Sequence, residues 1–87
     1  MTILINNEPL ADNINFTDDE IVVKLKDGRT LLVPIVWYPV IKNATKQQLN
    51  NYEIMGDGEG IHWIDLDEDL SVKGFFAGIS TAGKEVA

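Results

Sequence analysis

The sequence predicts a single small α+β domain, in which a small antiparallel sheet packs with two or three short helices. The sheet is expected to contain a hairpin around Asp27-Gly28 and one or two further short strands. Three observations predict this class: strand-like alternation on both sides of Asp27-Gly28, prolines and capping residues in the middle of the chain, and a length of 87 residues with 45% hydrophobic residues. We expect residues 1–78 to form the domain and residues 79–87 to form a flexible tail.

The strongest local signal is the predicted hairpin. Two β-rich runs, EIVVKLK and TLLVPI, flank the Asp27-Gly28 pair, and glycine supplies the positive φ that a tight reverse turn needs. Its lysines mark the solvent face, and Pro34, which lacks an amide donor, should end the second run. The apolar residues expected to face the core are Ile21, Val23 and Leu25. Weaker strand candidates are ILI at residues 3–5, NINF at residues 13–16 and IHWI at residues 61–64.

Two short helices are predicted after the hairpin. The first begins near Trp37, because Pro39 is tolerated only in the first turn of a helix. Its shared face would carry Trp37, Val40 and Ile41. Thr45, followed three residues later by Gln48, has the spacing of a capping box and therefore predicts a second helix over residues 46–53.

The stretch GIHWIDLDEDLSV at residues 60–72 contains the only histidine of the chain, followed by four carboxylates. We expect Asp65 to cap a third helix and Glu68 to complete a capping box. The acidic residues would then occupy the first turn, where the helix dipole favours anions by about 0.3–1 kcal/mol each. Gly74 or Gly78 would end this helix. The core side of the helix would carry Leu66 and Leu70.

The same stretch has some features of a metal or catalytic site. The D-x-D-x-D spacing from Asp65 matches the start of a calcium loop, but Leu70 and Phe76 stand where that loop needs glycine and glutamate. Other conceivable ligands are Asp57, Glu59 and His62. A histidine can also act as a general base, yet no plausible nucleophile and no second histidine accompanies this one. We therefore predict no metal, no cofactor and no catalytic residue.

The candidate binding residues fall into two groups. Four could line an aromatic and histidine pocket, although core and boundary positions are the favoured interpretation of them: Trp37, Tyr38, His62 and Trp63. Three more belong to the acidic run and could form part of an interaction surface: Asp67, Glu68 and Asp69.

Composition narrows the classes of function. The chain has no cysteine, which excludes disulfides and thiolate metal sites and favours a cytoplasmic location. The net charge of −7 and the lack of a basic patch argue against direct DNA binding and favour a basic protein partner. The longest apolar stretch, LLVPIVWYPVI, is shorter than the roughly 20 residues of a membrane span, so we expect no membrane association. An unprotected strand edge would also permit a homodimer.

Residues 27–78 resemble an uncharacterised prokaryotic family, domain of unknown function 2442. The motifs that carry the resemblance are the Asp-Gly hairpin, VPIVWYP, ATKQQLNN and GIHWIDLDEDLSVKGFFAG. The resemblance implies a small α+β domain without an established enzymatic activity, which occurs alone, fused to a helix-turn-helix domain, or encoded in pairs similar to toxin–antitoxin modules. The chain departs from the family pattern at Val40 and near Asn50, where arginines are common, and at Ile64, where proline is usual.

The sequence is compatible with three functions. The favoured one is a non-enzymatic protein-interaction domain, antitoxin-like or regulatory, that binds a protein partner of basic character. The second is a ligand-binding domain or enzyme that uses the aromatic and histidine pocket. The third is an acidic mimic of nucleic acid, in which carboxylates stand in for phosphates.

Overall fold

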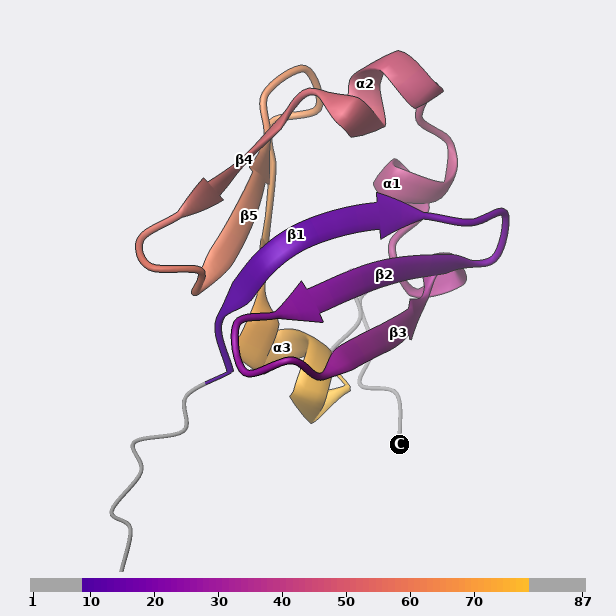
Figure 1. Ribbon diagram of the computed structural model, residues 1–87. Helices are drawn as coiled ribbons and strands as arrows, with labels where there is room; N and C mark the ends of the chain where they lie inside the picture. The colour runs from indigo at the N-terminus through magenta and orange to yellow at the C-terminus, as the bar shows by residue number, and fades with distance from the viewer. Residues whose placement is uncertain (1–8, 79–87) are drawn as a thin grey trace, which may run out of the picture.

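The computed structural model describes residues 9–78, which form two three-stranded antiparallel sheets and three short α-helices with one 3-10 turn (Figure 1). The predicted α+β class is therefore confirmed. Both the ILI segment and the predicted tail lie outside the described residues. The order of elements is β1 (Ala11–Phe16), β2 (Glu20–Leu25), β3 (Thr30–Pro34), η1 (Ile35–Trp37), α1 (Pro39–Lys42), α2 (Lys46–Asn50), β4 (Tyr52–Met55), β5 (Gly60–Trp63), β6 (Glu68–Ser71) and α3 (Val72–Ala77).

The first sheet has the order β1-β2-β3 and contains the predicted hairpin. Gly28 has a φ of 96°, and the amide of Leu25 donates to the carbonyl oxygen of Arg29 at 2.9 Å across the turn. Pro34 is the last residue of β3, as its missing amide predicts. The alternation also holds, because the residues of β2 that were expected to face the core are buried while its lysine is exposed: Ile21, Val23 and Leu25 against Lys24.

The second sheet has the order β4-β5-β6, and only its middle strand was predicted. The segment Tyr52–Met55, whose first two residues were expected to end a helix, pairs with β5 in antiparallel register. The third strand, Glu68–Ser71, also pairs with β5. The chain thus forms two sheets where the sequence indicated one.

The prediction of a helix capped by Asp65 is wrong. Residues 64–67 form the turn between β5 and β6, and Asp67 there has a φ of 49°, a left-handed conformation that aspartate tolerates better than most residues. The helix α3 begins instead at Val72, where the hydroxyl of Ser71 accepts from the amide of Gly74 at 2.9 Å. It ends at Gly78, whose φ is 74°. Strand pairing with β5 therefore overrides a local capping signal.

The two central helices are shorter than predicted. The capping box is present, because the Thr45 hydroxyl accepts from the Gln48 amide at 3.1 Å and the Gln48 side chain accepts from the Thr45 amide at 2.9 Å. However, α2 ends at Asn50. The segment near Trp37 divides into η1 and α1, and Val40 is exposed instead of sharing an apolar face with buried Ile41.

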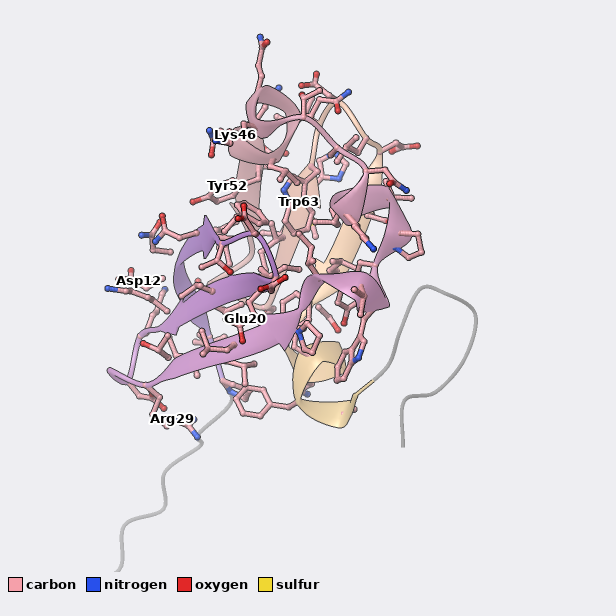
Figure 2. The ribbon with its side chains drawn as sticks, turned by 90° about the vertical axis from the view of Figure 1, so that its right-hand side faces the viewer. Asp12, Glu20, Arg29, Lys46, Tyr52 and Trp63 are labelled. Atoms are coloured by element: carbon pink, nitrogen blue, oxygen red, sulfur yellow. The ribbon has the colours of Figure 1, made fainter. Side chains whose placement is uncertain are left out.

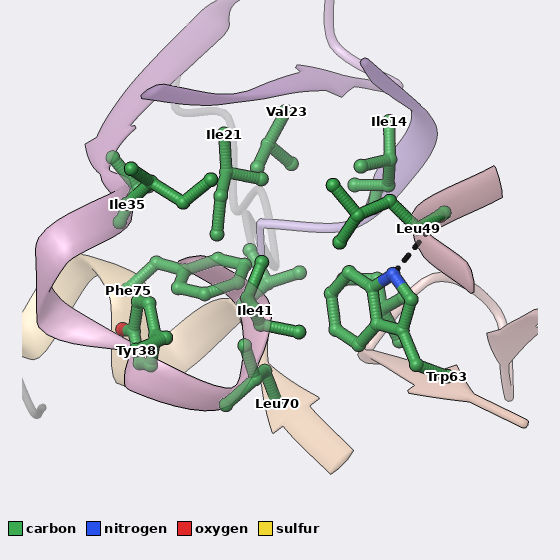
Figure 3. Close-up of a cluster of buried hydrophobic side chains, with 14 of the residues drawn as sticks. Ile14, Ile21, Val23, Ile35, Tyr38, Ile41, Leu49, Trp63, Leu70 and Phe75 are labelled. Carbon is green, nitrogen blue, oxygen red and sulfur yellow. Dashed lines mark hydrogen bonds between the residues drawn. The ribbon is translucent and has the colours of Figure 1, made fainter. Parts of the chain in front are cut away.

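The core lies between the two sheets, and the helices contribute side chains to it (Figure 3). In Figure 1, α2 and α3 lie at opposite ends of the molecule. The first sheet contributes Ile14, Ile21, Val23 and Val33, the second Ile61, Trp63 and Leu70, and the helical segments Ile35, Tyr38, Ile41, Leu49 and Phe75. Among residues 9–78, no helix has the length and apolar character needed to cross a membrane.

Candidate interaction surface

A row of three polar side chains crosses the outer face of the second sheet. The strand register places Glu53 of β4 opposite His62 of β5, and His62 opposite Asp69 of β6. Side chains alternate between the two faces of a strand, so these three point away from the core that Ile61 and Trp63 enter. Both carboxylates of the row are exposed, and the imidazole between them is partly buried.

The histidine of this row is bound by its neighbour. His62 Nδ1 pairs with the Oδ1 atom of Asp69. This hydrogen bond raises the pKa of His62 above 6.5, against a smaller opposing effect of desolvation, and the negative charges of Asp69, Glu53 and Asp67 add to the rise. His62 therefore keeps its proton to a higher pH than a free imidazole.

The charge of the chain is concentrated on this sheet. Residues 47–72 contain seven of the 14 carboxylates of the chain and neither lysine nor arginine, whereas residues 9–46 contain five acidic and five basic side chains. The turn at residues 56–59 contributes Asp57 and Glu59, and the turn at residues 64–67 contributes Asp65 and Asp67. The second sheet with its two turns thus has a charge equal to the net charge of the whole chain, −7.

Beside the row lies a hollow of about 500 Å³. Met55, Gly60 and Ser71 line it in cross-strand register, and Glu59 and Asp69 add carboxylates. The missing side chain of Gly60 keeps the hollow open, since a Cβ atom there would approach Met55 Cε to 3.1 Å and the Leu70 carbonyl oxygen to 3.2 Å. The hollow therefore combines an exposed thioether side chain with carboxylates. We call the outer face of β4, β5 and β6, with the turns at residues 56–59 and 64–67, the acidic face.

The predicted aromatic pocket does not form. Tyr38 and Trp63 are 1% and 0% exposed, and burial raises the pKa of the Tyr38 hydroxyl to about 12. Trp37 is partly buried and packs edge-on against Tyr38, with ring centroids 6.4 Å apart. His62 points to the other side of its strand from Trp63. These four residues therefore line no common site.

The three predicted acidic residues also separate. Asp67 lies in the turn, Asp69 on the outer face, and Glu68 opposite Trp63 on the inner face, partly buried. Consecutive residues of a strand cannot share a face, so a helical arrangement of these carboxylates is excluded. Within residues 9–78, no three histidine or carboxylate side chains are grouped as metal ligands would be.

Two residues of the acidic face, Glu53 and Met55, were not among the predicted site residues. The alternation of YEIM would have placed both on one side of a strand, opposite Tyr52 and Ile54. This alternation was missed because the amide-rich helix before it was predicted to continue through Glu53.

Comparisons with known proteins agree on the fold and assign no activity. A family model described as "Protein of unknown function (DUF2442)" matches residues 11–81. A crystal structure of a protein of unknown function from Rhodospirillum rubrum is similar, with 36% identity, 88% of this chain and 98% of that chain covered, and a TM-score of 0.75. A solution structure of uncharacterized protein CV0863 from Chromobacterium violaceum shares the fold at 24% identity, with 90% and 69% covered and a TM-score of 0.65. The search of curated proteins found no match.

Proposed function

The chain belongs to the DUF2442 family of proteins of unknown function, and we propose that it is a non-enzymatic interaction domain that binds a basic protein through the acidic face. The single observation that carries this proposal is the segregation of charge: one sheet and its turns have the whole net charge of the chain. Such a field attracts a basic partner and accelerates its association.

The hollow next to Asp69 supports a particular mode of contact. A lysine or arginine side chain of the partner can lay its methylene groups against Met55 and direct its cationic end to Glu59 or Asp69. Met55 is 37% exposed and adapts readily to a new apolar contact. The carboxylates in the two turns would then guide the partner without close contact.

The more specific form of this proposal is an antitoxin-like role in the cytoplasm, in which binding silences a small basic partner. It rests on the resemblance to proteins encoded in toxin–antitoxin-like pairs and on the charge of the acidic face. The alternative of an enzyme or ligand site built on Trp37, Tyr38, His62 and Trp63 loses its support, because two of these side chains lie in the core. A nucleic-acid mimic is less favoured, because His62 stands between Glu53 and Asp69 and interrupts the row of carboxylates.

The test compares two variants with the same change of charge. The first, Glu53→Gln/Glu59→Gln/Asp69→Asn, removes the charges of the carboxylates in the row and the hollow of the acidic face. The second, Asp12→Asn/Asp18→Asn/Asp19→Asn, removes three charges from exposed carboxylates of β1 and the β1–β2 turn. Tagged wild-type protein and both variants are used to recover partners from the source organism, and the recovered protein is then purified. We expect a basic protein that binds the wild type and the second variant, and binds the first variant about tenfold more weakly.

Equal binding by both variants, or recovery of no specific protein, would contradict the proposal. The antitoxin-like form has its own test, which is expression of the purified partner in a host cell with and without this chain. If the partner alone arrests growth and co-expression of this chain relieves the arrest, the antitoxin-like role is supported. If the partner does not affect growth, the antitoxin-like role is contradicted, while the proposed interaction with a basic protein still stands.

A further inference from the structure

A second site lies away from the acidic face. A pocket of about 450 Å³ opens between the end of β1, the β1–β2 turn and the helical segments η1, α1 and α2. This volume lies within the roughly 300–1,000 Å³ of small-molecule sites. Its apolar part is formed by Phe16, Ile35 and Leu49, of which Ile35 and Leu49 belong to the buried core and Phe16 packs against it. The pocket therefore offers a preformed apolar surface.

The rim of this pocket is polar and includes two cations. Lys42 at the end of α1 and Lys46 at the start of α2 both line it. Within residues 9–78 neither lysine makes an ion pair, whereas Arg29, at the other end of the molecule in Figure 2, is bound to Asp27 at 2.7 Å. Asp18 is the one carboxylate among the residues that line the pocket, so two positive charges face one negative charge.

Amide groups complete the rim. Asn15 from β1 and Asn50 from α2 line the pocket, and neither side chain has a hydrogen-bond partner among the described residues. Each amide provides two N–H donors, and each lysine provides three. Hydrogen-bond donors from β1, α1 and α2 thus surround one apolar surface. This arrangement occurs in a chain whose net charge is strongly negative.

We infer that this pocket binds a small organic anion. A carboxylate or phosphate group would accept hydrogen bonds from Lys42, Lys46 and the Asn50 amide, and a compact apolar body would cover Phe16 and Leu49. Charge-assisted hydrogen bonds to lysine supply the orientation, and the buried floor supplies the apolar contact. The site is independent of the acidic face, so either can exist without the other.

The experiment uses the full chain labelled with ¹⁵N and follows its amide signals during titration. Four probes separate the contributions: phenyl phosphate and benzoate carry both features, inorganic phosphate only the charge, and benzyl alcohol only the apolar body. We expect saturable shifts at residues 15–18 and 46–50 with phenyl phosphate or benzoate, at a dissociation constant of about 1 mM for probes this small. Inorganic phosphate and benzyl alcohol should bind at least about tenfold more weakly.

Two variants and one control test the assignment of residues. Lys42→Gln/Lys46→Gln and Asn50→Asp should each weaken phenyl phosphate binding about tenfold, the second by placing a negative charge in the pocket. Lys24→Gln/Lys26→Gln removes the same positive charge from exposed positions of β2 and its turn, and should leave binding unchanged. All three change exposed side chains, and a dispersed amide spectrum verifies their folding.

Three results would overturn the inference. The first is that neither phenyl phosphate nor benzoate produces saturable shifts. The second is equal weakening in the Lys42/Lys46 variant and the Lys24/Lys26 control, which would identify general attraction of anions to a lysine-bearing surface. The third is equal affinity for inorganic phosphate and phenyl phosphate, because the apolar floor would then contribute nothing.

Discussion

The indole N–H of Trp63 donates to the backbone carbonyl oxygen of Leu49 at 3.1 Å, inside the core (Figure 3). Leu49 lies in the last turn of α2, where carbonyl groups have no donor within the helix. The same ring packs against Phe16 and Tyr52, with centroids 6.3 and 6.4 Å away. One buried side chain thus joins the second sheet to α2 and to the first sheet.

Replacing this tryptophan should weaken the fold more than its loss of volume alone predicts. In Trp63→Phe the Leu49 carbonyl loses its buried donor and a small cavity remains, so we expect the free energy of unfolding to fall by about 2–4 kcal/mol. Urea denaturation followed by circular dichroism measures the change. Trp37→Phe is the control, and it should cost less because that ring is only partly buried. A loss in Trp63→Phe well below about 2 kcal/mol would show that the bond to Leu49 contributes little.

Gly58 joins the two sheets at a point where no side chain fits. The amide of Ala11 donates to the Gly58 carbonyl oxygen at 2.7 Å, and a Cβ atom on Gly58 would lie 2.5 Å from the Ala11 carbonyl oxygen. Gly58 also has a φ of 116°. We expect Gly58→Ala to lower the free energy of unfolding by about 2–5 kcal/mol, the sum of backbone strain and overpacking.

Gly28→Ala separates these two causes. Gly28 also has a positive φ, 96°, but no atom lies within 4 Å of its added Cβ. It should therefore show only the strain, about 1–2 kcal/mol, in the same urea experiment. If the free energy of unfolding fell equally in the two glycine variants, the close approach of β1 to the β4–β5 turn would contribute nothing to the cost of Gly58→Ala.

The start of α3 distinguishes the observed structure from the helix that the sequence suggested. Ser71 caps α3 through the amide of Gly74, while Asp65 lies in a turn and accepts from the exposed amide side chain of Asn51 at 3.1 Å. Ser71→Ala should therefore cost about 0.5–2 kcal/mol, and Asp65→Ala less than about 0.5 kcal/mol. Thermal unfolding of the two variants measures both. A larger loss in Asp65→Ala would favour a helix that begins at residue 65.

Local signals in the sequence were sufficient where the chain folds on itself over a few residues. The Asp-Gly turn and the Thr45–Gln48 box need only neighbours in sequence, and both are present. The strand Glu68–Ser71 needs β5 beside it, because only that pairing brings Leu70 opposite Ile61 in the core. Aspartate and glutamate are poor strand formers, so their run by itself favours a helix, and only the pairing with β5 makes it a strand.

The candidate surfaces depend even more on tertiary structure. His62 and Asp69 are seven residues apart and meet only because β5 and β6 pair in this register. Lys42, Lys46 and Asn15 share a pocket because β1 ends beside the helices, which no periodicity in the sequence indicates. The sequence was informative about residue types, namely the excess of carboxylates, and uninformative about which side chains would share a face.

The pairing of His62 with Asp69 predicts a specific dependence on pH. Asp69→Asn removes the largest contribution that raises the pKa of His62, and should therefore lower that pKa, as measured by ring-proton shifts in an NMR titration. Glu53→Gln removes only a charge effect and should lower the pKa of His62 by less. An unchanged pKa in Asp69→Asn would show that the imidazole does not bind this carboxylate in solution.

The sign of the effect on stability follows from the raised pKa. A group that binds its proton more tightly in the folded state stabilises that state fully below its unfolded pKa, near 6.5, and loses this contribution as the pH rises through the folded value. The stability difference between wild type and His62→Gln should therefore be greater at about pH 5.5 than at about pH 9. Because Asp69 is exposed and His62 only partly buried, high salt should reduce this pH dependence. A pH dependence insensitive to salt would point to a buried interaction instead.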